Sequence, residues 1–172
     1  MAEEEQGGPP AYPANAVHLA RTAVLSQMQL SAMADQKASI LMGAAFVIFT
    51  LAIGHSDGKA APLPLLILGG AAFLSAVFAV LAILPAVRYR KRAPLNLMFF
   101  GSFTQLGEEE YIERLLAQLG SDDSIYRTMA RDVYQNGNVL ARKKYRMLGW
   151  AYRIFLAGLT ASLAAFLIQS LA

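Results

Sequence analysis

Residues 33–43 read MADQKASILMG and continue as AAFVIFTLAIG, residues 44–54. Asp35 and Lys37 stand at the entrance of this stretch, and the 17 residues that follow, Ala38–Gly54, contain no charge. A helix rises about 1.5 Å per residue, so roughly 17–25 apolar residues cross the hydrocarbon of a bilayer. The stretch therefore predicts a membrane-spanning helix whose boundary is marked by two opposite charges.

Two further apolar runs have the same character. Leu63–Val87 contains 25 residues without a charge, and Gly149–Ala172 contains 24 residues with Arg153 as the only charge. Over the whole chain 56% of residues are apolar and 16% are charged, against about 25% charged in an ordinary soluble domain. Backbone groups find no hydrogen-bond partners in lipid, so each run is expected to be helical. The remaining residues are too few to cover three such helices in a soluble core.

Lysine and arginine are distributed unevenly about the three runs. The connection 55–62 holds only Lys59, whereas residues 88–148 hold eleven basic residues. The positive-inside bias places this long segment and the amino terminus in the cytoplasm. Basic residues that flank apolar runs are explained by topology and by contact with anionic membrane lipid, so we expect no nucleic-acid partner.

These features predict an all-α membrane protein. Its three transmembrane helices extend into a cytoplasmic helical bundle, which one short helix completes. Helical spacing predicts that the second helix continues to about Arg92, with a kink at Pro85. It also predicts that one helix runs from Ser121 into the third apolar run. Gly137 and Gly149 are the positions where that helix is expected to be least stable. The expected segments are a disordered tail (1–14), a cytoplasmic helix (15–37), transmembrane helix 1 (38–54), an external turn (55–62), transmembrane helix 2 (63–87), a cytoplasmic helical segment (88–148) and transmembrane helix 3 (149–171).

Catalytic chemistry is not indicated. The chain has no cysteine, and the predicted topology places His18 and His55 on opposite sides of the membrane. The sequence contains no phosphate-binding loop, dinucleotide-binding fingerprint or metal-ligand motif. We expect a protein that is not an enzyme and holds neither a metal nor a resident cofactor.

Asp35 and Lys37 cannot pair with each other, because side chains two positions apart on a helix point about 200° apart. Lys37 can reach lipid phosphates. An acid at the same level meets anionic lipid, so Asp35 is expected to contact a basic residue of another helix, such as Arg88 or Lys144. Asp35, Lys37 and Arg88 are thus candidates for a tie between the helices just inside the membrane.

Small residues recur at four-residue spacing within two of the runs. They let helices approach closely, either within one chain or between copies in an oligomer. The rows are Ala71, Ser75 and Ala79 in the second run, and Ala157, Ala161 and Ala165 in the third.

Basic and aromatic side chains are mixed along residues 122–148. This mixture suits a nucleotide, and it suits equally a solvated amphipathic helix near a membrane. Spacing alone leaves both interpretations open. The residues concerned are Arg127, Arg131, Arg142, Lys143 and Lys144, with Tyr126, Tyr134, Tyr145 and Phe103.

Several segments, taken in order, resemble the membrane effector of the Pycsar bacterial anti-phage system. They are MADQKASILMGAAFVI, LNLMFFGSF, EEEYIERL and YRTMARDVYQNGNVLARKKYRMLGWAYRIF. The resemblance runs from about Ala16 to the third apolar run. No segment resembles the β-rich cyclic-nucleotide-binding fold.

The resemblance implies a function that composition does not. A companion pyrimidine nucleotide cyclase would make cUMP or cCMP, and the effector would respond by impairing the bacterial inner membrane, which causes abortive infection. We further expect a homo-oligomer, and from the mixture of basic and aromatic residues we assign the ligand site to Arg127, Arg131, Tyr134, Lys143 and Lys144. The alternatives are a ligand-free structural or scaffold membrane protein and a channel subunit.

Overall fold

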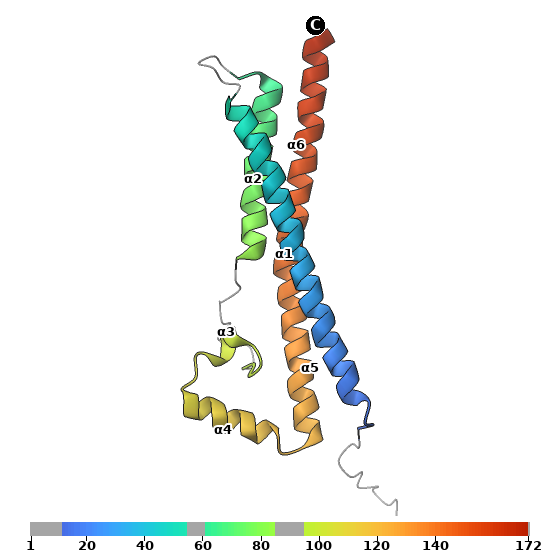
Figure 1. Cartoon of the computed structure of the whole chain (residues 1–172), viewed down its shortest axis with the longest axis vertical. Coiled ribbons are helices and arrows are strands. Elements are labelled where there is room, and N and C mark those ends of the chain that lie inside the picture. Colours follow the sequence, from blue (N-terminus) through green and yellow to red (C-terminus); the bar gives the residue numbers. More distant parts are fainter. Residues whose placement is uncertain (1–11, 55–60, 85–94, 172) are drawn as a thin grey trace, which may run out of the picture. The chain divides into compact units, whose positions relative to one another are not determined.

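The computed structural model describes residues 12–54, 61–84 and 95–171, and every regular element in these ranges is a helix (Figure 1). The all-α fold class is therefore confirmed. The elements are α1 (Ala16–Gly54), α2 (Leu63–Ile83), α3 (Phe100–Phe103), α4 (Glu108–Gln118), α5 (Asp122–Val139), the π-helix η1 (Leu140–Tyr145) and α6 (Arg146–Leu171).

The chain forms two compact units. The polar unit comprises Met1–Met28 and Ala86–Asn138, and it contains the beginning of α1 together with α3, α4 and α5. The apolar unit comprises Gln29–Pro85 and Val139–Ala172, and it contains the rest of α1 together with α2, η1 and α6.

Three stretches of helix are long and apolar enough to cross a membrane. They are α1, α2 and the continuous helical stretch Asp122–Leu171. Their large apolar side chains remain mostly on the surface; Phe46 is 70% exposed and Ile168 is 69% exposed. A helix that is apolar on its outer face suits lipid rather than water, so these are the helices of a membrane protein.

Small residues bring α2 and α6 close together in antiparallel orientation (Figure 1). The Ser75 hydroxyl donates to the Ala151 carbonyl at 2.9 Å, and the Ser162 hydroxyl donates to the Pro64 carbonyl at 2.8 Å. Between these bonds the helices are closer still, because a Cβ added to Gly158 would lie 2.0 Å from the Ala71 Cβ. Only a residue without a side chain fits there.

The two predicted rows of small residues have different positions. Ala71 contacts α6, and Ser75 and Ala79 are completely buried, so the α2 row lies within the packed unit. Ala157 and Ala161 of the other row are exposed. The α6 surface that packs is rotated by one position and passes through Ala151 and Gly158 instead.

The covered side of α1 repeats at alternating steps of four and three residues. Such a heptad spacing keeps one seam of a helix against its neighbours. Most of the seam is alanine or serine, which permits close approach. Its members, all buried or half-buried, are Ala20, Val24, Gln27, Ser31, Ala34, Ala38, Leu41, Ala45, Ile48 and Ala52.

The second apolar helix is shorter than the sequence predicts. α2 ends at Ile83, and Leu84 adopts an extended conformation with φ −49° and ψ 128°. Leu84 precedes Pro85, whose ring disfavours helical geometry in the residue before it. The predicted helix, with a kink at Pro85 and an end at Val87 or about Arg92, is therefore wrong at Leu84, where the regular helix has already ended; residues 85–94 lie outside the described residues. Arg88 and the predicted external turn at residues 55–60 lie outside the described residues.

The ends of the other helices are close to their predicted positions. α1 is uninterrupted from Ala16 to Gly54, and α4 begins with Glu108, Glu109 and Glu110 in its first turn. Two features were not predicted, namely the single turn α3 within residues 95–107 and the π-helix η1. Of the predicted disordered tail, residues 1–11 lie outside the described residues. Tyr12 is ordered against α5, where its hydroxyl donates to Asp123 at 2.9 Å.

We expect Gly158→Ala to destabilise the apolar unit. The added methyl group would force α2 and α6 apart, and overpacking of this kind costs about 1–3 kcal/mol. Gly149→Ala in the same helix is the matched control, because its added methyl group meets nothing within 4 Å. Thermal unfolding of the full chain in detergent, followed by circular dichroism, should show a lower Tm for Gly158→Ala alone. Equal Tm values for the two variants would contradict the close approach.

Candidate functional site

Asn96 anchors the segment that follows α2 to the polar unit. Its side-chain amide donates to Asp132 of α5 at 2.9 Å, and its side-chain oxygen accepts from the Met98 amide at 2.9 Å. Its own backbone amide donates to the Ser102 hydroxyl at 3.0 Å. Asn96 is 2% exposed and Asp132 is 6% exposed. A buried carboxylate needs such donors, and a second one comes from Asn136 at 2.8 Å.

This anchored segment forms one wall of a pocket of about 320 Å³ in the polar unit. The other walls come from α4 and α5. The volume is at the lower end of the range for small-molecule sites, about 300–1,000 Å³. The lining residues are Leu95, Asn96, Leu97, Arg114, Ala117, Gln118, Thr128 and Arg131.

Two guanidinium groups make the pocket cationic. Arg131 comes from α5 and has no hydrogen bond or ion pair within the described part of the chain. Arg114 comes from α4 and bonds Glu110 at 2.6 Å, one helical turn away. Both side chains of that pair are about half exposed, at 51% and 48%. Exposed pairs of this kind are worth little, so an anion in the pocket can compete for Arg114.

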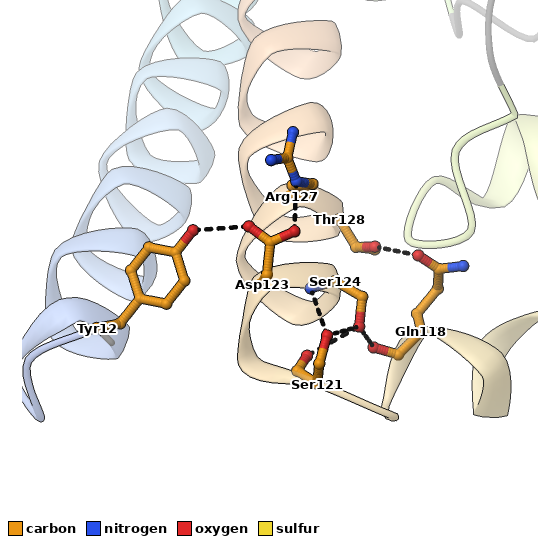
Figure 2. A network of polar contacts seen from close by, with 7 residues as sticks. All are labelled: Tyr12, Gln118, Ser121, Asp123, Ser124, Arg127 and Thr128. Atoms are coloured by element: carbon orange, nitrogen blue, oxygen red, sulfur yellow. Dashed lines mark hydrogen bonds and ion pairs between the residues drawn. The ribbon is translucent and has the colours of Figure 1, made fainter. Parts of the chain in front are cut away.

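Neutral polar groups complete the lining of the pocket. The Thr128 hydroxyl donates to the Gln118 side-chain oxygen at 3.1 Å, which leaves the two N–H groups of that amide as further donors. Figure 2 shows this bond between α4 and α5, next to the serine pair that caps α5. In that cap the Ser124 amide donates to the Ser121 hydroxyl at 3.2 Å. The cap and the cross-helix bond hold the pocket walls together.

Arg127 is engaged elsewhere in the polar unit. Its Nε donates to Asp123 at 2.6 Å, and Tyr12 donates to the other oxygen of the same carboxylate (Figure 2). The hydrogen bond from Arg127, and then the one from Tyr12, lower the pKa of Asp123. The bond to Asp123 raises the pKa of the Tyr12 phenol. The Arg127 side chain is 74% exposed and does not line the pocket.

The two predicted lysines belong to the apolar unit. Lys144 binds both carboxylate oxygens of Asp35, at 2.7 and 2.8 Å, and the Ser31 hydroxyl at 2.8 Å. Asp35 therefore contacts the last helix, through one of the two partners proposed from the sequence. Lys143 donates to the Leu84 carbonyl at 2.7 Å.

Tyr134 and Lys37, the remaining described residues among those assigned to the ligand site or the tie, take part in neither the pocket nor the Lys144–Asp35 pair. Tyr134 is 72% exposed and lies outside the pocket lining. The Lys37 side chain forms no ion pair with another described residue, although the Lys37 carbonyl accepts from the Tyr152 hydroxyl at 3.2 Å. Of the five residues predicted to hold a ligand, only Arg131 lines the described pocket. Within residues 12–54, 61–84 and 95–171, no three His, Asp or Glu side chains gather as a metal site would require.

A comparison with known protein families gives one match that covers most of both units. The family model for the Pycsar effector protein domain matches residues 18–169. The chain belongs to the Pycsar effector family. Residues 18–169 include all but the terminal two residues of α1 and of α6, the whole of α2 and every residue that lines the pocket.

A curated relative agrees with this assignment. The chain is 33% identical over 109 residues to the Pycsar effector protein PtPycTM of Propioniciclava tarda. The alignment covers 59% of this chain and 52% of the relative, so the chain spans about half the length of that protein. No solved structure matches the chain.

Sequence reasoning missed Arg114, Asn96 and Asp132. The signal was present for Asn96, since an isolated amide in the apolar stretch LNLMFF requires a buried partner. Asp132 gave no such signal, because an acid in a polar helix is normally solvated. Arg114 was hidden by its i,i+4 spacing from Glu110, which by itself explains the charge.

We expect Asn96→Ala to destabilise the polar unit by about 1–3 kcal/mol, because Asp132 would lose one of its two amide donors while remaining buried. Asn138→Ala is the matched control, since its amide bonds only the Tyr134 carbonyl of its own helix. Thermal unfolding and limited proteolysis of residues 95–107 would measure the difference. Equal protease resistance in the two variants would argue against the anchor.

Proposed function

We propose that this chain is the membrane effector of a Pycsar anti-phage defence system. A partner cyclase makes a cyclic pyrimidine mononucleotide, cUMP or cCMP, in an infected cell. The chain binds it and impairs the inner membrane, so that growth stops before phage spread. The single observation that carries the proposal is the family match over residues 18–169, which covers a cationic pocket and three apolar helices in one chain.

The charge distribution supports a cytoplasmic pocket. Eleven of the fifteen lysine and arginine residues fall within residues 88–148, and this segment includes the pocket lining of α4 and α5. The positive-inside bias then gives a multi-pass protein of the bacterial inner membrane with a cytoplasmic amino terminus. A nucleotide made in the cytoplasm reaches such a site directly.

The pocket is proposed as the nucleotide site. Arg131 and Arg114 bind the cyclic phosphate, because guanidinium groups match the geometry of phosphate oxygens and bind them with charge-assisted hydrogen bonds. Gln118 and Thr128 offer donors and acceptors to the edge of the base. The volume of about 320 Å³ favours one mononucleotide over a larger cyclic oligonucleotide.

The other residues proposed from the sequence take supporting positions in this scheme. Arg127 orients Asp123 and Tyr12 at the start of α5, and Tyr134 remains on the exposed side of that helix. Lys143 and Lys144 act on the apolar helices, which they contact directly. The nucleotide contacts are thus assigned to Arg131 together with Arg114.

Membrane impairment is proposed to involve several copies of the chain. Exposed apolar side chains cover α1, α2 and α6, and Ala157 and Ala161 lie exposed on α6. In a membrane these surfaces face lipid or another copy. A homo-oligomer would replace part of the lipid contact with contacts between helices.

Cells that express the chain with and without an active partner cyclase test the function. We expect the membrane potential to collapse only when the cyclase is active, as read by a potential-sensitive dye. Expression with a catalytically dead cyclase is the control. Depolarisation that ignores the cyclase would support a channel subunit, and a stable potential in all cells would support a ligand-free structural protein.

Titration of the purified chain with cUMP and cCMP tests the pocket. We expect Arg131→Gln and Arg114→Gln each to weaken binding at least about tenfold, because each removes a charge-assisted hydrogen bond worth about 1.5–3 kcal/mol. Arg127→Gln removes the same charge outside the pocket and should bind within about twofold of the unmutated chain. Equal losses in all three variants would mean that only overall charge matters.

A further inference from the structure

The π-helix η1 is the point where α6 is tied to both other apolar helices. η1 occupies Leu140–Tyr145, directly after α5 and directly before α6. π-helical turns are rare and are concentrated at functional sites, because their i→i+5 pattern is less stable than an α-turn. Three consecutive residues of η1, Lys143, Lys144 and Tyr145, each contact a neighbouring helix or its end.

Lys144 makes the strongest of these contacts. An ammonium group has three N–H donors, and Lys144 uses them on both oxygens of Asp35 and on the Ser31 hydroxyl, all within 2.8 Å. Its side chain is only 19% exposed. Ser31 and Asp35 are one turn apart on α1, so Lys144 fixes both the rotation and the axial position of that helix against η1.

Lys143 holds the end of α2 in a comparable way. It donates to the Leu84 carbonyl at 2.7 Å, immediately beyond the last turn of α2. Carbonyls at a helix end lack partners within the helix and carry partial negative charge, so they attract cations. Adjacent lysines of η1 thus bind α1 and α2 separately.

The close approach at Gly158 and the Ser75 and Ser162 bonds fix the register of α2 against α6, but none of them holds α1. Five of the seven buried core residues at this level are alanine, so the directional bonds of the lysines contribute much of what positions α1 there. The pair is partly buried, with the Asp35 side chain 42% exposed, and polar pairs of this kind can define register between helices. The core residues are Ala34, Ala38, Leu41, Ala79, Ala82, Leu148 and Ala151.

We propose that Lys143 and Lys144 form an autoinhibitory latch, which holds the apolar helices in a resting, closed arrangement. Release of the two bonds frees α1 and the end of α2 to move, while the Ser75 and Ser162 bonds keep the rest of α2 against α6, and this movement opens the membrane lesion. Because η1 follows α5 without interruption in the chain, a small rotation of α5 reaches the two lysines directly. The inference rests on the proposed membrane activity, but it does not require the nucleotide to bind the pocket.

Charge exchange across the latch is the decisive experiment. Asp35→Lys and Lys144→Asp each place like charges in contact, so each single variant should collapse the membrane potential in cells that lack the cyclase. The double variant restores an opposite pair at the same position and should return the potential to the level of the unmutated chain. The matched control is Arg127→Asp, which reverses one charge of an exposed pair on the polar unit and should leave cyclase-free cells polarised.

The variant Lys143→Ala tests whether depolarisation by the charge variants comes from loss of the latch or from misfolding of the protein. Its bond lies in an exposed setting, so the variant should reach the membrane at normal levels. It should lower the cyclase expression needed for half-maximal depolarisation by at least about threefold. Single charge variants that are present in the membrane fraction but leave cyclase-free cells polarised would overturn the latch, as would a double variant that depolarises as strongly as either single one.

The same cells separate failure of the latch from failure of the proposed function. If the unmutated chain ignores the cyclase while the single charge variants still depolarise, nucleotide activation is wrong and the latch stands. If the unmutated chain responds to the cyclase but the variants do not depolarise without it, nucleotide activation stands and the latch is wrong.

Discussion

The close approach of α2 and α6 is the constraint on which the apolar unit depends. Lipid gives apolar helices no hydrophobic reason to associate, so packing and hydrogen bonds must hold them together. Gly158 removes the side chain that would collide with Ala71, and this brings the Ser75 hydroxyl within reach of the Ala151 carbonyl. A large residue at either position would separate the backbones and remove both sources of attraction. The small-residue seam of α1 extends the same solution to the third helix.

Because alanine side chains offer little shape for recognition, the relative positions of the apolar helices depend strongly on polar contacts between them. Each tie across the apolar unit ends on a carbonyl, a hydroxyl or a carboxylate, and no buried side-chain nitrogen or oxygen among the described residues lacks a partner. The polar unit uses the same strategy with amides, since Asn96 and Asn136 satisfy buried Asp132. In both units a few directional bonds define the geometry, and apolar contact supplies the area around them.

The sequence was informative wherever a single energetic contribution, such as the burial of apolar residues in lipid, decides the structure. Run length predicted three apolar helices, and the cost of an acid at the membrane boundary pointed from Asp35 to Lys144. The π-helix, the pocket and the end of α2 depend instead on small free-energy differences between competing local conformations and tertiary contacts. The sequence predicted one regular helix from Ser121 into the third apolar run, and it did not predict that Leu140–Tyr145 is a π-helix. The pocket could not be predicted, because Arg114 and Arg131 line a common pocket whose third wall, residues 95–97, is held in place by the tertiary bond between Asn96 and Asp132. The helix end at Ile83 was predictable from Pro85, which we interpreted as a kink.

Magnitudes decide whether a mononucleotide can control such a membrane protein. A ligand shifts an equilibrium only by the difference between its affinities for the two states, and a change from 1:99 to 99:1 takes about 5.5 kcal/mol. The exposed bond of Lys143 is worth at most about 1 kcal/mol, and the partly buried contacts of Lys144 are worth more. A micromolar ligand has about 8 kcal/mol of binding free energy in total, and only the part that it gains in the released state alone acts on the equilibrium. The proposed latch of two lysines thus lies within the range that the differential affinity of one small anion could overcome. A larger interdigitated core between the same helices would exceed that range, which gives a physical reason for alanine beside the lysines.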